Sequence, residues 1–125
     1  MKVVELMNSN VVTCRPSESL IVIVNRFELF NISGMPVVEK GKLAGMICQS
    51  DILKNLGGEG INLKDLTVKD VMIEEVITVS PIESVETAAK RMIEKHINRI
   101  PVVENNIVVG IVTRTDIVKA VAECG

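Results

Sequence analysis

The chain contains 125 residues, of which 47% are hydrophobic and 24% charged, and its formal net charge is −2. This length favours one compact unit, and the slightly acidic balance argues against a chain that bulk charge drives onto DNA or anionic lipid. The longest uninterrupted apolar run, residues 20–24, is far shorter than the roughly 20 residues of a membrane span. Because Glu5 interrupts any signal-peptide apolar region, the sequence predicts a cytoplasmic protein with no membrane segment.

The cysteines argue against a disulfide framework, and the scarcity of aromatic residues argues against a further class of function. Cys14, Cys48 and Cys124 are odd in number and widely separated, which is typical of reduced thiols rather than of a disulfide framework. The chain has no Trp, no Tyr and only two Phe. Aromatic platforms that stack single-stranded nucleic acid are therefore nearly absent, which argues against nucleic-acid binding as the function.

The sequence repeats itself without a gap after 65 residues. The identical pairs include Met7 with Met72, Thr13 with Thr78, Pro16 with Pro81, Gly45 with Gly110 and Asp51 with Asp116. We assign two repeats, residues 3–56 and 68–121, joined by a linker over residues 57–67 that opens glycine-rich. A unit this short buries too little apolar surface to be stable alone. We therefore expect two units about a pseudo-twofold axis, with one shared core and ligand clefts between them.

In the first repeat, residues 20–24 taken alone would predict a buried strand. They align, however, with a clear helical pattern in the second repeat, and this alignment overrules the local pattern. We predict a helix here, whose core stripe is Leu20, Ile23, Val24 and Phe27.

The second repeat predicts the order of the elements. Residues 76–79 are β-branched and predict a short strand, which Pro81 ends. A helix with Ser84 as its N-cap should follow. Its apolar stripe consists of Val85, Ala88, Ala89, Met92 and Ile93.

A hairpin and a second helix complete the repeat. Residues 101–104 and 107–112 predict the two strands, with a turn at Asn105 and Asn106. The next helix should begin at Asp116. Each repeat is thus predicted to be a β-α-β-β-α unit, and the fold class is mixed α+β.

One side of the predicted first helix is apolar where the second repeat is polar. The residues Ile21, Val22, Leu29 and Phe30 replace Glu86, Thr87, Glu94 and Lys95. Scattered surface apolar residues would explain the difference, but a contiguous patch indicates a self-association face. We predict a homodimer through isologous contact of the first repeat.

The sequence contains no pattern that indicates catalysis. The single histidine, His96, lies near the predicted end of a helix, where histidine is more often a favourable partner of the helix dipole than a catalyst. The cysteines form no C-x-x-C pair, and neither a P-loop nor a G-x-G-x-x-G signature occurs. We predict a protein that is not an enzyme and has no metal site and no resident cofactor.

A strand that runs into a helix start recurs in both repeats, at residues 45–51 and 110–116. Thr113 and Asp116 have the spacing of a capping box, which is a purely structural explanation. The same geometry suits a nucleotide, because a glycine admits a ligand to the backbone, free N–H groups hold phosphate and a carboxylate accepts both ribose hydroxyls. Both interpretations stay open from the residues alone.

Taken in order, these pieces resemble a tandem pair of cystathionine-β-synthase (CBS) domains, also called a Bateman module. The resemblance rests on the two Thr–Pro segments, on residues 33–38 and 98–103, and on the two strand–helix motifs. It implies a mixed α+β pair of small sheets flanked by helices. It also implies regulatory binding of AMP, ADP, ATP, S-adenosylmethionine or related thioadenosines, and dimers formed through helices.

The resemblance further implies two ligand sites, each built from the strand–helix motif of one repeat and the early segments of the other. Site A would use Thr13, Ile32, Ser33, Gly34, Pro36, Ile111, Thr113, Arg114 and Asp116. Site B would use Met46, Cys48, Gln49, Asp51, Thr78, Asn98, Arg99, Ile100 and Pro101. Cys48 stands where the family usually has Ser or Thr, and a thiol is a poor donor. Arg99 matches a basic position that meets phosphates in some relatives.

Because no aromatic side chain is available to stack on adenine, Ile32, Met35, Ile100 and Ile111 are candidates for its apolar contacts, with ordinary core packing as the alternative. The leading hypothesis is a sensor whose ligand shifts the angle between the repeats and so regulates a separate protein. The alternative is a structural module for homodimerisation with vestigial sites. Nucleic-acid binding is a third hypothesis, against which the acidic charge weighs.

Overall fold

The computed structural model describes residues 1–58 and 60–124, except for the side chain of Cys124. The chain divides into two compact units. The first, here called the terminal unit, consists of Met1–Val11 and Ile77–Gly125, and the second, the central unit, consists of Val12–Val76.

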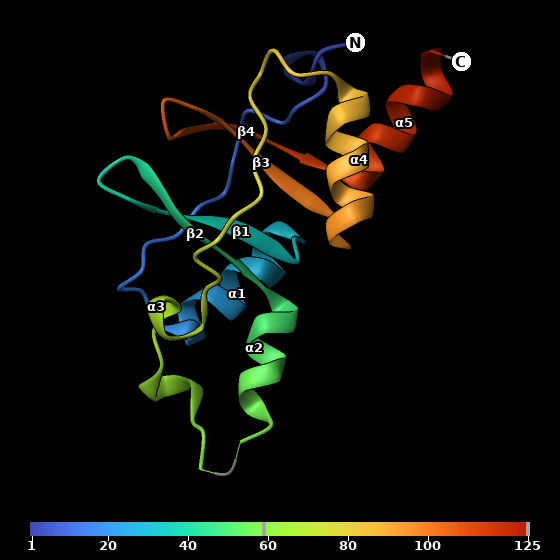
Figure 1. Cartoon of the computed structure of the whole chain (residues 1–125). Coiled ribbons are helices and arrows are strands. Elements are labelled where there is room, and N and C mark those ends of the chain that lie inside the picture. The colour runs from blue at the N-terminus through green and yellow to red at the C-terminus, as the bar shows by residue number, and fades with distance from the viewer. Residues whose placement is uncertain (59, 125) are drawn as a thin grey trace. The chain divides into compact units, whose positions relative to one another are not determined.

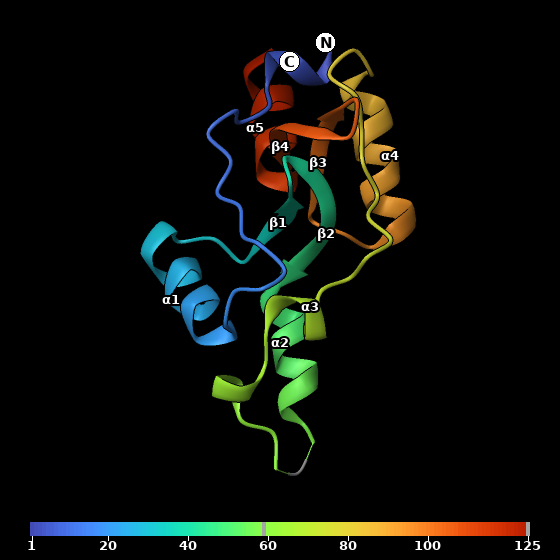
Figure 2. The same ribbon diagram turned by 90° about the vertical axis from the view of Figure 1, so that its left-hand side faces the viewer.

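Each unit contains a long helix, a two-stranded hairpin and a second helix, in that order (Figure 1). The central unit comprises α1 (Leu20–Phe30), β1 (Gly34–Glu39), β2 (Lys42–Cys48), α2 (Gln49–Leu56), the 3-10 turn η2 (Leu63–Asp65) and α3 (Val68–Val71). The terminal unit comprises the 3-10 turn η1 (Val3–Glu5), α4 (Val85–Lys95), β3 (Arg99–Glu104), β4 (Ile107–Thr113) and α5 (Arg114–Cys124). Figure 2 shows β2 running directly into α2. The predicted mixture of helices and small sheets is confirmed.

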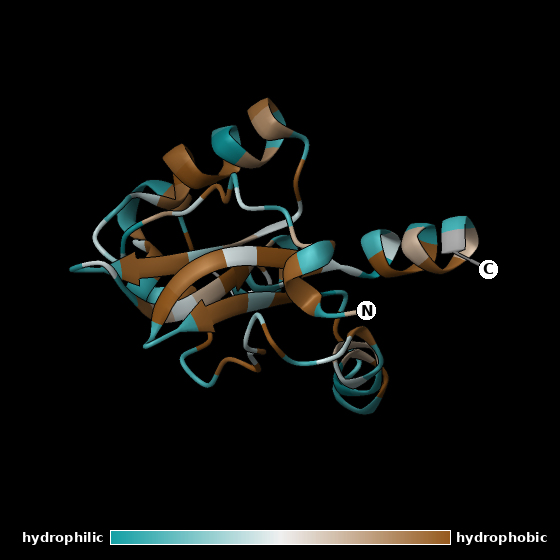
Figure 3. Cartoon of the chain, turned by 90° about the horizontal axis from the view of Figure 1, so that it is seen from above, coloured by the Kyte–Doolittle hydropathy of each residue, from teal (hydrophilic) through white to brown (hydrophobic). Residues whose placement is uncertain are grey.

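Both hairpins are antiparallel and share one register. Pro36 pairs with Met46 in the central unit, and Pro101 pairs with Ile111 in the terminal unit. The turn of the second hairpin lies at Asn105 and Asn106, whose φ angles of 52° and 64° suit the tight turn predicted for them. Figure 3 shows the strands coloured mainly as hydrophobic and the hairpin turns as hydrophilic.

The long helices begin and end at equivalent residues. Ser84 caps α4, as predicted, because its Oγ accepts a hydrogen bond from the N–H of Thr87 at 3.1 Å. Ser19 caps α1, which confirms a helix where residues 20–24 alone favour a strand. Both helices end at a residue in the left-handed region, Asn31 (φ 52°) or His96 (φ 54°). His96 therefore lies at a helix end, as predicted.

The predicted strand at residues 76–79 is wrong in its length. Only Val79 pairs, in a single parallel bridge with Val102. The bridge consists of two hydrogen bonds, from Val79 N to Pro101 O (3.2 Å) and from Val103 N to Val79 O (2.9 Å). The carbonyl just before this bridge, Thr78 O, accepts a hydrogen bond from the Arg91 side chain at 2.8 Å instead of from a strand, so the pairing does not extend back toward residue 76. Cys14 makes the equivalent bridge to Val37 in the central unit.

The first segment of each repeat joins the unit formed by the other repeat. Val3 donates its N–H to Glu83 O at 2.9 Å and is fully buried in the terminal unit. Val68, the equivalent residue, donates to Glu18 O at 2.9 Å in the central unit. The compact units therefore differ from the sequence repeats by an exchange of about the first nine residues.

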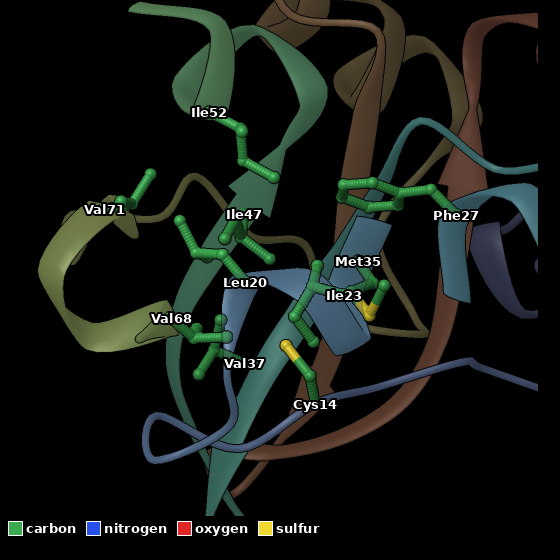
Figure 4. Close-up of a cluster of buried hydrophobic side chains, with 10 residues drawn as sticks. All are labelled: Cys14, Leu20, Ile23, Phe27, Met35, Val37, Ile47, Ile52, Val68 and Val71. Carbon is green, nitrogen blue, oxygen red and sulfur yellow. The ribbon is translucent and has the colours of Figure 1, made fainter. Parts of the chain in front are cut away.

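Each unit has its own hydrophobic core, so the prediction of one shared core is wrong. Figure 4 shows the central cluster, in which Leu20, Ile23 and Phe27 of α1 lie among side chains of both strands. These three confirm the predicted stripe, but Val24 does not, since it is 37% exposed. In α4, Val85, Ala88 and Met92 are buried as predicted, whereas Ala89 is only partly buried and Ile93 is 74% exposed.

The predictions about membrane segments and about the cysteines can now be compared with the structure. Within the part of the chain that the structure describes, no helix combines the length and the apolar character needed to cross a bilayer. Among the cysteines whose side chains are described, neither Cys14 nor Cys48 forms a disulfide, in agreement with reduced thiols. The side chain of Cys124 lies outside the described residues.

Candidate functional site

The junction of β4 and α5 is a capping box. The Thr113 N–H donates to Oδ2 of Asp116 at 2.9 Å, and the Asp116 N–H donates back to Oγ1 of Thr113 at 3.2 Å. These bonds satisfy backbone groups that the first helical turn leaves without partners. The structural interpretation of this motif is therefore confirmed, and the carboxylate of Asp116 is held in a fixed position.

The junction of β2 and α2 has the same arrangement with a different side chain at the cap. The Cys48 N–H donates to Oδ2 of Asp51 at 2.9 Å, and Asp51 is 9% exposed, which makes it a buried charged residue. Asn55 donates to the backbone oxygen of Asp51 at 2.8 Å. This carboxylate is therefore as firmly placed as that of Asp116.

The glycines of the two motifs face protein atoms, which contradicts the interpretation that they admit a ligand to the backbone. A Cβ at Gly110 would stand 2.5 Å from Sδ of Met7. A Cβ at Gly45 would stand 2.8 Å from Ile73 O and 3.0 Å from Sδ of Met72. Glycine is required here because the exchanged first segment crosses the strand at this point.

A repeated ion pair is the feature that the sequence analysis missed. Arg26 binds Glu18 through both terminal nitrogens, at 3.0 and 2.8 Å, and also donates to Thr13 O at 3.0 Å. Arg91 makes the same three bonds in the other repeat. Both residues of each pair are conserved between the repeats, and this identity is the signal that would have found them.

The ion pair changes the acidity of its carboxylates. The hydrogen bonds of Arg26 are the main cause that lowers the pKa of Glu18, and those of Arg91 lower the pKa of Glu83. Close by, burial raises the pKa of the Cys14 thiol to about 12. Cys14 is thus a thiol and not a thiolate at neutral pH.

Each unit also carries a groove beside its long helices. A hollow of about 580 Å³ in the terminal unit is lined by residues of α4 and α5, and one of about 560 Å³ in the central unit is lined by residues of α1 and the start of α2. The first contains Ile93 and the second contains Val24. These two side chains are exposed because they border a groove rather than the core.

The apolar side of α1 is exposed, as predicted for a self-association face. The exposed fractions are 38% for Ile21, 44% for Val22, 78% for Leu29 and 51% for Phe30. The homodimer itself stays a prediction.

Two segments of the chain, residues 3–58 and 68–123, match the CBS domain. The chain belongs to the CBS-domain family. Its two CBS domains form a tandem pair, and tandem CBS pairs are regulatory modules.

Among solved structures, the CBS domain pair of protein MJ0100, in complex with 5′-methylthioadenosine and S-adenosyl-L-methionine, is 31% identical and has a TM-score of 0.89. The similarity covers 100% of this chain and 98% of that one. The CBS domain-containing protein YhcV of Bacillus subtilis is 31% identical over 90% of this chain and 80% of its own length. The chain spans 40% of a further relative, the uncharacterized protein MJ1232 of Methanocaldococcus jannaschii, at 37% identity. It also spans 60% of the uncharacterized protein MK0525 of Methanopyrus kandleri.

The residues of each predicted ligand site are divided between the two compact units. The central unit holds Thr13, Ile32, Ser33, Gly34 and Pro36 of site A with Met46, Cys48, Gln49 and Asp51 of site B. The terminal unit holds Ile111, Thr113, Arg114 and Asp116 of site A with Thr78, Asn98, Arg99, Ile100 and Pro101 of site B. Within each unit the two sets touch, since Gln49 N donates to Ser33 O (2.9 Å) and Arg114 N to Asn98 O (2.8 Å).

The four residues suggested for adenine contacts differ in how deeply they are buried. Met35 and Ile100 are fully buried members of the two cores, as the core alternative predicts. Ile32 and Ile111 are only half-buried and keep some surface for a ligand. Among the described residues, no group of three or more His, Cys, Asp and Glu side chains is arranged to hold a metal ion.

Proposed function

We propose that this CBS pair is a sensor of adenosine-containing ligands, namely AMP, ADP, ATP, S-adenosylmethionine or a thioadenosine. The observation that carries the proposal is the similarity along the whole chain to the CBS pair of MJ0100, solved with 5′-methylthioadenosine and S-adenosyl-L-methionine. The ligand acts as an effector and is not turned over. Its binding changes the arrangement of the two repeats, and a separate partner protein reads this change.

In this proposal, site A is built around the start of α5. The Arg114 guanidinium suits a phosphate or another anionic group, because the Arg114 and Asp116 N–H groups of the first helical turn already bond to Asn98 O and to Oγ1 of Thr113. Asp116 suits the two ribose hydroxyls, because a carboxylate only accepts hydrogen bonds. Its Oδ2 accepts from Thr113 N, and Oδ1 takes the ribose. The other members are Thr13, Ile32, Ser33, Gly34, Pro36 and Ile111.

Site B uses the start of α2, where Asp51 is the ribose acceptor. Cys48 offers a weaker donor than the hydroxyl of Thr113 in site A. Arg99 supplies a positive charge for a phosphate. We therefore expect site A to bind nucleosides more tightly and site B to depend on a phosphate group. The other members are Met46, Gln49, Thr78, Asn98 and Pro101, while Ile100 remains a core residue.

The first experiment is to identify what the purified protein carries. Without Trp and Tyr, the chain contributes little near-ultraviolet absorbance, so a bound adenine dominates the spectrum. The protein is denatured and any released molecule is identified by mass spectrometry. The ligand-free chain is then titrated by calorimetry with AMP, ATP, 5′-methylthioadenosine and S-adenosylmethionine.

Two variants assign the sites. Asp116→Ala should remove binding at site A and Asp51→Ala at site B, while urea unfolding verifies that each variant is folded. A wild-type chain that binds none of the four compounds contradicts the proposed function. Binding that survives in both variants contradicts the site assignment alone.

The second candidate function is a structural module for homodimerisation, in which the ligand sites are vestigial. The observation in its favour is the exposed apolar side of α1, with Leu29 and Phe30 more than half exposed. Cys48 in place of a hydroxyl also favours it. The titrations above separate the candidates, since only the sensor binds the adenosine compounds.

A further inference from the structure

The two arginine–glutamate pairs hold the chain segments that carry Thr13 and Thr78 in place through hydrogen bonds. In the central unit, Arg26 holds Thr13 O at one end of the segment and the Glu18 carboxylate at the other. Glu18 in turn accepts a hydrogen bond from Arg15 N at 2.8 Å. Residues 13–18 therefore form a closed loop around one guanidinium.

The terminal unit repeats this loop with nearly the same distances. Arg91 donates to Thr78 O at 2.8 Å and to Oε2 and Oε1 of Glu83 at 2.9 and 2.8 Å. Ser80 N donates to Glu83 at 2.8 Å. We call each set of bonds an arginine lock: Arg26, Glu18 and Thr13 O in the central unit, and Arg91, Glu83 and Thr78 O in the terminal unit.

The peptide that follows each threonine is fixed from its other side by the hairpin. Cys14 N donates to Pro36 O at 3.1 Å and Val38 N donates to Cys14 O at 2.8 Å. With the carbonyl of Thr13 held by Arg26 and the next N–H held by Pro36, the orientation of the Thr13 backbone is determined. The Thr13 side chain therefore leaves the backbone in a defined direction.

The terminal lock borders a hollow. Thr78, Glu83 and Arg91 line a depression of about 510 Å³ on the surface of the terminal unit. The lock is thus at an accessible place rather than in the core. The side chains of its two charged residues are 35% and 32% exposed, and those of the central lock are 23% and 20% exposed.

We propose that Arg26 and Arg91 are positioning residues for the two ligand sites, each acting through the threonine whose carbonyl it holds. This inference rests on the proposed function, in which Thr13 belongs to site A and Thr78 to site B. Neither guanidinium touches the ligand. Each arginine sets the direction of one threonine, so each controls the affinity of one site.

A positioning role can be distinguished from a general contribution to the stability of the unit. A partly exposed ion pair contributes little to the free energy of folding. Loss of a lock therefore leaves the unit folded but frees the threonine segment. The central unit also supplies Asp51 to site B, so a general loss of its stability would weaken both sites, whereas loss of positioning weakens site A alone.

The test uses Arg26→Lys and Arg91→Lys, because lysine keeps the charge but cannot bind a carboxylate through two nitrogens while it holds a carbonyl. Each is placed in the Asp51→Ala chain, which keeps site A, and in the Asp116→Ala chain, which keeps site B. The chains are titrated by calorimetry with AMP and with 5′-methylthioadenosine. The two arginine variants are each other's matched control.

We expect Arg26→Lys to weaken site A about tenfold, the effect of losing one well-placed hydrogen bond, and to leave site B unchanged within about twofold. Arg91→Lys should do the reverse. Equal losses at both sites, or no loss at either, overturn the inference while the proposed function stands. If the unsubstituted chain binds none of AMP, ATP, 5′-methylthioadenosine and S-adenosylmethionine, the proposed function fails first and the inference fails with it.

A second readout needs no ligand. Hydrogen exchange of the Cys14 amide should accelerate in Arg26→Lys, and that of the Val79 amide in Arg91→Lys, because both amides belong to the locked peptides. The Met46 amide, which bonds to Ile73 O at 2.9 Å in the central unit, is the reference and should not change in Arg26→Lys. Unchanged exchange at Cys14 and Val79 overturns the positioning role directly.

Discussion

The side chain of Met7 fills the space that any side chain at Gly110 would need. An added Cβ at Gly110 would lie 2.5 Å from Sδ and 2.9 Å from Cγ of Met7. Asn8, the next residue, pairs with Ile111 beside this contact. The glycine that opens the strand–helix motif is therefore a packing requirement of the exchanged first segment.

We predict that Gly110→Ala and Gly45→Ala each destabilise the protein by about 1–3 kcal/mol, the usual range for overpacking a filled site. At Gly110 the clash is with a side chain, whereas at Gly45 the nearest atom is the backbone oxygen of Ile73. Met7→Ala should therefore relieve part of the cost of Gly110→Ala. Met72→Ala should relieve less of the cost of Gly45→Ala. Urea unfolding of the single and double variants measures both couplings, and equal rescue would contradict this account.

The parts of the fold that local chemistry determines were predictable from the sequence. Ser84 before an apolar stripe specifies a helix start, and Asn105 and Asn106 between two β-branched runs specify a tight turn. The capping box of Thr113 and Asp116 depends only on residues three apart. Alignment of the repeats then corrected the misleading run at residues 20–24.

The parts that depend on distant partners were not predictable in this way. Nothing local in residues 3–11 indicates that they pack with the second repeat, and so nothing indicated that Met7 fills the space beside Gly110. The arginine locks join residues eight apart across a turn, and only their recurrence in both repeats marks them. Ile93 fits the helical stripe by spacing, yet it borders a groove that its own unit leaves open.

Acid should weaken the protein through Glu18 and Glu83. Their folded-state pKa values lie below the unfolded values, so the two pairs stabilise the fold above the unfolded pKa, and this contribution is lost as the pH falls through the folded pKa. We expect stability to decline below about pH 4.3, the ordinary pKa of Glu. In Glu18→Gln/Glu83→Gln, stability at neutral pH should fall by up to about 1 kcal/mol per pair and the acid decline should be shallower. Thermal unfolding across pH tests this, with Glu75→Gln as the control, and an unchanged acid decline would contradict it.

The Cys14 thiol should resist alkylation in the native protein. Its pKa of about 12 leaves almost no thiolate at neutral pH, and it is 3% exposed. In the Cys48→Ser/Cys124→Ser chain, iodoacetamide should modify Cys14 only when the protein unfolds, as followed by mass spectrometry with and without denaturant. Rapid alkylation of the folded chain would contradict the buried position.

The same thiol should make stability depend on alkaline pH. Because the pKa of Cys14 is raised in the folded state, stability should decline as the pH rises above the ordinary value of 9.0.

The cap at the start of α5 should be separable from the proposed ligand role of the same carboxylate. Asp116→Asn keeps an oxygen that accepts from Thr113 N, so we expect a stability loss smaller than the roughly 1 kcal/mol of Asp116→Ala. Both variants should weaken site A, since neither offers a carboxylate to the ribose. Urea unfolding and calorimetry with AMP measure the two effects on the same samples. A variant that loses stability and keeps its affinity would restrict Asp116 to the cap.

The apolar side of α1 predicts a homodimer that charge should dissociate. Ile21→Glu/Leu29→Glu gives α1 the residues that α4 carries at the equivalent positions, Glu86 and Glu94, so the helix itself should tolerate them. We expect the variant to sediment as a monomer while the wild type sediments as a dimer. Ile107→Glu, which places one charge on an exposed apolar residue of the β3–β4 hairpin, is the control and should stay dimeric. If the α1 variant keeps the dimer mass, the interface lies elsewhere, and if the wild type is a monomer, the exposed face has another role.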